Sequence, residues 1–414
     1  MIESYFCPRV VVRLRAGPEF GVLEAFLAYL HLRGHSRATV QRYVREAEVL
    51  LRSLRRQRRP IRSLTEVDVR RFACRRRRRQ HPRSDCRAAL RHLIRHLRER
   101  GLIPPKQPSF PAHIERIVAA FDAHLRDVAG LASATRLYRR RYAGDFIRSV
   151  FGTKPIHWAR VRPTHVHAFL AEYGRTGRVA AARVAAVSLR SFFRWLQFNG
   201  LGDKHLSAAV PCFRQWRHAT LPSVLSDSQY RAFLVTFDRT STSGRRDYAL
   251  AVCMGDLGLR VAEVAALMID DVDETATTLR IAAGKTRRGR ILPMTKRVSQ
   301  GILGYLRRDR PRSADQHLFL RHHTPAGTGV SRELIRGVVR RAFAKVAGCE
   351  QHTGTHILRH TAATRLHRAG ADIKRVADIL GHRSIDTAAS YAKVNLDRLF
   401  AVALPWPTAG EVQP

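Results

Sequence analysis

Near its C-terminus the chain carries side chains whose types suit chemistry on a phosphodiester. His356 and Arg359 are three positions apart, so on a helix they share one face. Gly381 follows an apolar run at helical spacing and predicts a left-handed helix end, from which His382 emerges. Tyr391 is expected on a further short helix. Two imidazoles, a guanidinium and a phenol could therefore converge.

The phenol of Tyr391 is a moderate nucleophile whose phosphate ester remains a usable leaving group. A phosphoryl-transfer transition state gathers negative charge on oxygens, which guanidinium and imidazole donors stabilise. Such a site needs further cations, and two upstream motifs supply them. Arg260 lies near the start of a predicted helix in Gly-Leu-Arg-Val-Ala-Glu, and Lys285 lies in a predicted tight turn in Gly-Lys-Thr-Arg-Arg-Gly.

These motifs follow one another along the chain with separations that fit a single active site: Arg260, Lys285, His356 with Arg359, His382 after Leu-Gly, and Tyr391. In that order they resemble the active site of the tyrosine recombinases, the phage integrase family. The resemblance covers roughly residues 221–404, and each catalytic position of the family is matched. Glu263 also fits, because the family carries an acidic residue three positions after its first arginine, and its carboxylate is expected to orient the Arg260 guanidinium.

The resemblance implies that Tyr391 attacks a DNA phosphate and leaves a 3′-phosphotyrosyl link with a free 5′-hydroxyl. Arg260 and Arg359 are expected to hold the non-bridging oxygens with a bidentate geometry that lysine does not supply. We expect His356 to accept the phenol proton and Lys285 to protonate the departing 5′-oxygen.

This expected reaction requires neither a metal ion nor another cofactor. Positive side chains would stabilise the charge, and His382 would add a hydrogen bond to a phosphate oxygen. The phosphotyrosyl ester keeps the bond energy for rejoining, so no ATP is needed.

Two local motifs resemble those of other protein classes, but each lacks one residue that its class requires. Gly284–Thr286 resembles the end of a phosphate-binding loop, but the glycine required five positions earlier is Leu279. His356 and His360 have the spacing of zinc ligands, but the glutamate that the metalloprotease motif needs after the first histidine is Ile357. His360 is therefore expected to have a packing role.

The chain has 75 lysine and arginine residues against 33 aspartate and glutamate residues, a formal net charge of +42. Such an excess indicates a polyanionic partner, and double-stranded DNA is the expected one. A run of five arginines between the third and fourth predicted helices is either a solvated surface or a loop that contacts phosphates. The candidates for DNA contact are Arg75, Arg76, Arg77, Arg78, Arg79, Arg287 and Arg288.

The cysteines and the hydropathy indicate a cytoplasmic protein that associates with the nucleoid when it binds DNA. Six cysteines are scattered without a Cys-x-x-Cys pair, so we expect reduced thiols and neither a disulfide framework nor a zinc site. The N-terminus shows no signal-peptide pattern. No apolar run approaches the roughly 20 residues of a membrane helix.

A four-helix pattern recurs along the first half of the chain. Gly34 is matched by Gly130, 96 positions later, and residues 90–102 are matched by 189–201 at an offset of 99. Small drift in the offset with preserved apolar positions is typical of a duplicated module. Both copies resemble the small helical core-binding domain that precedes the catalytic domain in tyrosine recombinases. Most members carry one copy, so the role of the first remains open. The aromatic residues of the second copy fall at helical spacing and are expected in its core: Phe192, Phe193, Trp195 and Phe198.

The predicted fold is mainly α-helical, with a small β-hairpin or sheet in the catalytic domain. Two tandem SAM-like helical core-binding modules precede that domain. The predicted boundaries are an N-terminal arm or edge strand at 1–16, module 1 at 17–104, a linker at 105–112, module 2 at 113–204, a linker at 205–221, the catalytic domain at 222–405 and a tail at 406–414.

The sequence thus predicts a site-specific DNA recombinase or integrase, most simply one that serves a mobile element. Strand exchange between two duplexes implies a homotetramer on DNA, alone or with other recombinases. The alternatives are a type IB topoisomerase, which uses similar chemistry, a non-catalytic basic DNA-binding protein with a helix-turn-helix, and a cationic RNA-binding module. The non-catalytic DNA-binding protein leaves Arg260 and Lys285 unexplained, and no motif supports the RNA-binding module.

Overall fold

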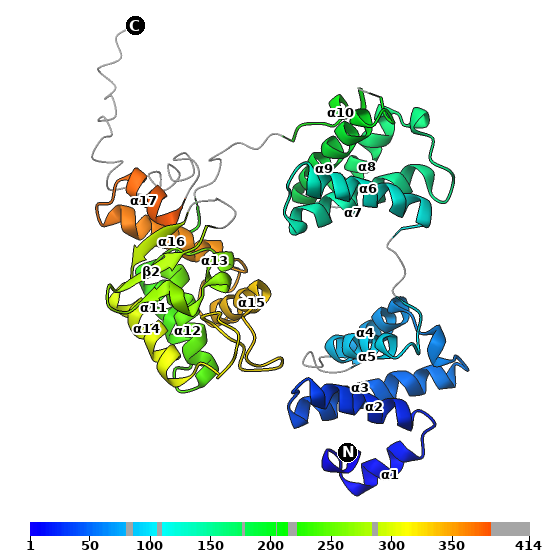
Figure 1. The fold of residues 1–414 in the computed structure, drawn as a ribbon, viewed down its shortest axis with the longest axis horizontal. Coiled ribbons are helices and arrows are strands. Elements are labelled where there is room, and N and C mark those ends of the chain that lie inside the picture. The colour runs from blue at the N-terminus through cyan, green and yellow to red at the C-terminus, as the bar shows by residue number, and fades with distance from the viewer. Residues whose placement is uncertain are drawn as a thin grey trace, which may run out of the picture. The chain divides into compact units, whose positions relative to one another are not determined.

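The predicted mainly helical fold with a small sheet is confirmed by the computed structural model (Figure 1). The structure describes residues 1–79, 86–105, 110–175, 179–203, 205–213, 222–283 and 289–381, and of 76–79 only the backbone. Contacts group Met1–Leu97 with His218–Pro414 as one unit and Arg98–Arg217 as another. None of the helices in the described ranges has the length and apolarity needed to cross a membrane.

The segment predicted as an N-terminal arm or edge strand is helical instead. A 3-10 turn, η1 (Ile2–Ser4), is followed by α1 (Pro8–Arg15). Pro8 stands at the first position of that helix, where its missing N–H costs nothing. Val11 and Leu14 are three residues apart and both buried, so α1 presents a short apolar stripe. The prediction missed this helix because a stripe of two residues is a weak signal.

The first helical module buries apolar side chains of its helices in a common core. Ser36 caps α3, because its Oγ accepts a hydrogen bond from the Thr39 amide at 3.4 Å. Leu23, Leu50 and Leu90 are among the side chains removed from solvent. The elements are α2 (Phe20–Leu32), α3 (Arg37–Arg56), η2 (Ile61–Ser63), α4 (Glu66–Arg79) and α5 (Cys86–Glu99).

The run of five arginines, predicted as a loop or a solvated surface, forms the last turns of α4. Of these five arginines, only the side chain of Arg75 lies among the described ones. Arg75 is exposed. Cations near a helix C-terminus are also favoured by the helix dipole. A contact between this run and DNA stays a prediction.

The second helical module has an aromatic core, as predicted for Phe192, Phe193 and Trp195. Phe198 was assigned to the same core, but it is 80% exposed. Gly144 lies so close to Phe110 that an added Cβ would stand 2.3 Å from the ring. The elements are α6 (Ala112–Asp127), α7 (Ser133–Phe151), η3 (Trp158–Arg160), α8 (Pro163–Arg175), α9 (Val179–Phe198) and α10 (His205–Ala208).

The C-terminal part packs around α12, whose last seven residues are all buried. Its three strands form an antiparallel sheet in the order β1-β2-β3, with Leu279 opposite Leu292. The elements are α11 (Asp227–Val235), α12 (Thr242–Gly255), α13 (Val261–Ala266), η4 (Ile269–Asp271), β1 (Val272–Asp273), β2 (Thr278–Ile281), β3 (Arg290–Pro293), α14 (Lys296–Arg308), α15 (Arg332–Phe343), α16 (His356–Arg368) and α17 (Ile373–Leu380).

A cluster of imidazole and phenol rings fills the first module between α2, α3 and α5. The rings of His35 and His92 lie 4.9 Å apart, and those of Tyr43 and His92 lie 5.8 Å apart. His35 Nε2 and His92 Nδ1 are buried without a hydrogen-bond partner. Burial, followed by the charges of His35 and nearby arginines, lowers the pKa of His92 to about 4. The cluster is therefore neutral at pH 7.

We expect the His92 imidazole to titrate near pH 4 when histidine resonances are followed by NMR and assigned with a His92→Gln variant. The pKa in the folded chain lies below the ordinary value of 6.5, so the first module should lose stability as the pH falls from 6.5 towards about 4. A His92 resonance that titrates at its ordinary value would contradict a packed ring cluster.

Candidate active site

The loop between α12 and α13 places Arg260 at the start of α13. Gly258 has a φ of +65°, which favours glycine, and an added Cβ would stand 2.4 Å from Leu380 of α17. Asp256, just before this loop, accepts a hydrogen bond from the Tyr230 hydroxyl at 2.9 Å and pairs with Arg365 of α16 at 3.3 Å. The loop is thus held between α11, α16 and α17.

Glu263 orients Arg260, as the sequence predicted. Its Oε1 accepts a hydrogen bond from Arg260 Nη1 at 2.8 Å, and its Oε2 accepts one from the Arg260 amide at 2.9 Å. Burial raises the pKa of Glu263, but hydrogen bonds from Arg290 and from the Arg260 amide outweigh burial, so the pKa lies below its ordinary value. The carboxylate is therefore charged at neutral pH and fixes the guanidinium plane.

Arg290 is a member of this site that the sequence analysis missed. Its Nη2 lies 3.1 Å from Glu263 Oε2, and its Nε donates to the Ile379 carbonyl at 2.7 Å. The Arg290 and Glu263 side chains are only 11% and 13% exposed. Arg290 shares its strand face with buried Leu292, since side chains two apart in a strand point the same way. That alternation was the signal for an inward-facing arginine.

Arg359 lies on α16 and is 4% exposed. Its Nη1 donates to the Gly258 carbonyl at 2.6 Å, and its Nη2 donates to the Leu380 carbonyl at 2.6 Å. Arg260 reaches the same place, since its Nη2 donates to the Gly381 carbonyl at 3.2 Å. The two arginines predicted to act together are therefore brought together at the C-terminal end of α17.

The end of α17 has the left-handed geometry predicted for Gly381. Its φ and ψ are 62° and 52°, and its amide bonds back to the Asp378 carbonyl at 3.0 Å. An added Cβ would stand 2.9 Å from Arg290 Nη1, so glycine is needed for space as well as for conformation. Gly381 is the last described residue, and the next residue in sequence is the predicted catalytic His382.

His356 is the first residue of α16 and is accessible from solvent. Partial desolvation, followed by the charges of Arg359, Arg260 and Arg336, lowers its pKa below the ordinary value. A neutral imidazole of this kind can accept a proton at pH 7. His360 lies one turn later, with its ring centroid 6.3 Å from that of His356, and its pKa is also lowered, first by burial.

Five of the predicted residues lie outside the described residues: Lys285, Arg287, Arg288, His382 and Tyr391. Their roles stay predictions. In the described ranges, no group of histidine, cysteine and acidic side chains is arranged to hold a metal ion. The arrangement that can be described comprises two converging guanidinium groups, a charged carboxylate that orients one of them, and a neutral imidazole. It suits the stabilisation of a phosphoryl group.

We expect Arg290→Gln to destabilise the C-terminal part by about 3 kcal/mol, because Glu263 would lose one partner of a nearly buried ion pair. The melting temperature should fall by about 6–12 °C in calorimetry of the full chain. Arg280→Gln is the matched control. Arg280 lies on β2, the strand beside β3, and pairs with Asp271, but its side chain is 63% exposed. That variant should lose less than about 1 kcal/mol. Equal losses in both variants would show that Arg290 is an ordinary surface arginine.

Comparison with known proteins gives a consistent result. The model of the phage integrase family matches residues 223–398, and the model of the phage integrase N-terminal SAM-like domain matches residues 23–101. A protein of Sinorhizobium fredii named as an integrase/recombinase, y4rA, is 34% identical over 336 residues, 81% of this chain and 81% of its own length. The tyrosine recombinase XerD of Lacticaseibacillus casei is 30% identical over 57% of this chain and 80% of its own length.

Solved structures share the fold at lower sequence identity. XerH site-specific recombinase bound to palindromic difH substrate aligns with a TM-score of 0.55 and 17% identity over 72% of this chain and 97% of its own. A lambda integrase dimer bound to a COC′ core site aligns with a TM-score of 0.54 and 16% identity over 80% of this chain and 91% of its own. The resemblance predicted from the sequence is confirmed, and the chain belongs to the phage integrase family of tyrosine recombinases, enzymes that break and rejoin DNA strands.

Proposed function

We propose that the chain exchanges strands of double-stranded DNA at specific sites, with Tyr391 as the nucleophile. The observation that carries this proposal is the convergence of Arg260 and Arg359 on one end of α17, with Glu263 orienting the first. Relatives in solved structures are bound to DNA, which supports the same partner here. The net charge of +42 supports it independently.

The described geometry supports a proposed role for Arg260, Arg359 and His356. An incoming phosphate would replace the backbone carbonyls of Gly258, Leu380 and Gly381 as acceptor for the two guanidinium groups. Both groups are then in place before the reaction, so little reorganisation accompanies charge development. His356, neutral and accessible, would accept the phenol proton. Lys285 would protonate the leaving 5′-oxygen, and His382 would bond a phosphate oxygen.

The assembly and the biological setting are part of the same proposal. Two duplexes must be held together for strands to be exchanged, so we propose a homotetramer on DNA, acting alone or with other recombinases. The second helical module would grip DNA beside the cleavage site, and the first would contact a further DNA segment or another protomer. We propose that the recombination serves a mobile element, and the relatives named as integrases support this setting.

We expect Tyr391→Phe to abolish the covalent protein–DNA adduct while leaving DNA binding unchanged, because the variant lacks only the attacking oxygen. The measurement uses a nicked duplex made from the DNA that flanks the gene, so that cleavage traps the adduct for denaturing electrophoresis. Adduct should form with 5′-labelled and not with 3′-labelled scissile strand. An adduct that survives Tyr391→Phe would refute the assignment.

Relaxation of supercoiled plasmid without the flanking sequence separates the recombinase from the topoisomerase alternative. A recombinase should leave this plasmid supercoiled, whereas a type IB topoisomerase should relax it. Relaxation that is fast and independent of sequence would favour the alternative and leave the assignment of Tyr391 intact.

The single-turnover cleavage rate should fall to half of its plateau value only below pH 6.5. The reason is the sign of the shift at His356: its pKa lies below 6.5, so more than half of the imidazole is still neutral and able to accept a proton at that pH. His356→Gln should lower the rate by about 10²–10⁴-fold. His360→Gln is the control and should keep the wild-type profile. A rate that already halves near pH 7 would argue against His356 as the base.

A further inference from the structure

One groove of the second helical module is lined by cations. It has a volume of about 570 Å³ and lies between α6, α7 and α9. Arg139, Arg190 and Arg194 line it, and no carboxylate does. In the part of the chain that the structure describes, none of these three arginines forms an ion pair with an acidic side chain. An anion is therefore the complementary ligand.

The neighbouring arginines of α7 show that this lack of carboxylates is specific to the groove. Arg136 and Arg140 pair with acidic residues of α6, Arg136 with Asp122 at 3.0 Å and Arg140 with Glu115 at 2.6 Å. Arg139, between them in sequence, turns to the other side and donates to the Ser191 hydroxyl of α9. Burial lowers the pKa of Arg139, as expected for a half-buried cation without a counterion.

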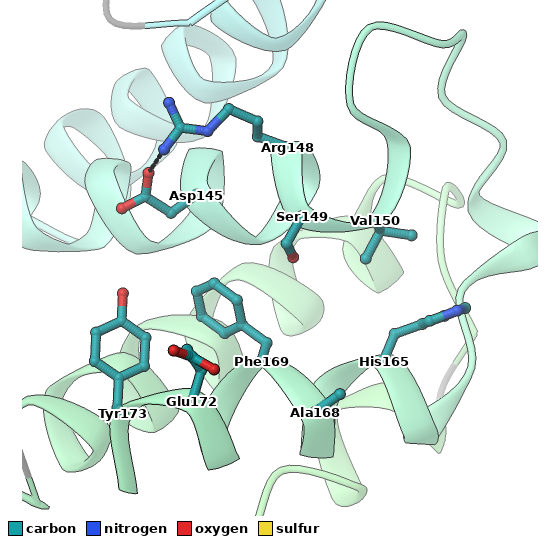
Figure 2. Close-up of a pocket in the computed structure, with 9 residues that line it drawn as sticks. All are labelled: Asp145, Arg148, Ser149, Val150, His165, Ala168, Phe169, Glu172 and Tyr173. Atoms are coloured by element: carbon teal, nitrogen blue, oxygen red, sulfur yellow. Dashed lines mark hydrogen bonds and ion pairs between the residues drawn. The ribbon is translucent and has the colours of Figure 1, made fainter. Parts of the chain in front are cut away.

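A second groove of the same module has the opposite character. It lies between α7 and α8, and Figure 2 shows Asp145 and Arg148 on α7 facing Glu172 and Tyr173 on α8. Two carboxylates line it, and its arginine, Arg148, is already paired with Asp145 at 2.6 Å. A phosphate would meet like charges there. The groove at α9 is therefore the better candidate for contact with a nucleic-acid backbone.

The exposed side of α9 combines these cations with unburied apolar side chains. Val184, Val187, Ser191, Arg194 and Phe198 follow one another at intervals of three or four residues, so they form one stripe along the helix. Val187 is 52% exposed and Phe198 is 80% exposed. We call this stripe the α9 face. Exposed apolar side chains here lie beside arginines that have no acidic partner among the described residues.

The major groove of DNA is complementary to such a face. It is about 12 Å wide and admits a helix about 10–12 Å across. Phosphates flank the groove and would bind Arg139 and Arg194, whereas the 5-methyl group of thymine is the apolar contact that base edges offer. Small branched side chains such as Val184 and Val187 fit against such a methyl group. The hydroxyl groups that RNA presents are polar and do not complement these apolar valine side chains.

We propose that α9 lies in the major groove and that Val184 and Val187 read thymine methyl groups, while Arg139 and Arg194 hold the flanking phosphates. This inference rests on the proposed DNA partner and adds what sets the preferred sequence. It concerns binding alone and does not depend on the identity of the nucleophile.

The test replaces thymines by deoxyuridine, which lacks only the methyl group. The full chain first selects its preferred duplex from a random pool, and each thymine of that duplex is then replaced singly. Wild-type affinity should fall about fourfold at one or two positions, the equivalent of one methyl group returned to water. The variant Val184→Ser, Val187→Ser should bind thymine and deoxyuridine duplexes equally. Because both valines are exposed, the variant should fold like the wild type, which circular dichroism verifies.

Two matched variants make the test specific. Val235→Ser removes an exposed valine from α11, outside the α9 face, and should keep the wild-type preference for thymine. Arg194→Gln should weaken binding to all sequences alike and lower the slope of affinity against salt by about one ion. Wild-type affinity unchanged by deoxyuridine at every position would overturn the inference, as would a preference for thymine that survives in the double valine variant. Covalent adduct formed in either case would show that the catalytic proposal stands without it.

Discussion

The structure depends on the attraction between guanidinium groups and the carbonyl end of α17. The last carbonyls of a helix lack intrahelical partners and carry a partial negative charge, so cations are favoured there. Arg260 and Arg359 both donate to these carbonyls, and Arg290 donates to the Ile379 carbonyl one residue earlier. Three elements far apart in sequence are thereby joined at one point. The same electron-rich oxygens hold the place that a phosphate would take.

Glu263 makes this crowding of positive charge tolerable. The guanidinium groups of Arg260 and Arg290 would repel each other in this partly buried site, but both form hydrogen bonds with the Glu263 carboxylate between them. The pKa of Glu263 is lowered despite burial, so the carboxylate keeps its charge and reduces the local excess of positive charge. The residue therefore stabilises the site and orients Arg260 at the same time. Such carboxylates are scarce relative to cations in this chain, which has a net charge of +42.

The sequence predicted those parts of the site in which local spacing and chemistry agree. The partnership of Arg260 with Glu263 and the left-handed end at Gly381 follow from short-range patterns, and both were confirmed. The contacts of Arg290 were harder to predict from the sequence, because a charged residue at the start of a strand is usually exposed. Its partners lie in α13 and α17, and only the folded chain brings them together. The prediction that Phe198 lies in the core was wrong. Helical spacing identifies the residues that share a stripe, but it does not show whether another element covers that stripe.

The two helical modules show how copies of one pattern can acquire different surfaces. Arg139 and Ser191 line the cationic groove of the second module, and the matching positions of the first, at offsets of 96 and 99, are Tyr43 and His92. In the first module the rings pack against one another, and His92 stays neutral at pH 7. Neutral packed rings at these positions offer a phosphate no positive charge. If both modules contact DNA, we expect them to do so through different faces, because the positions that the predicted repeat matches differ in charge.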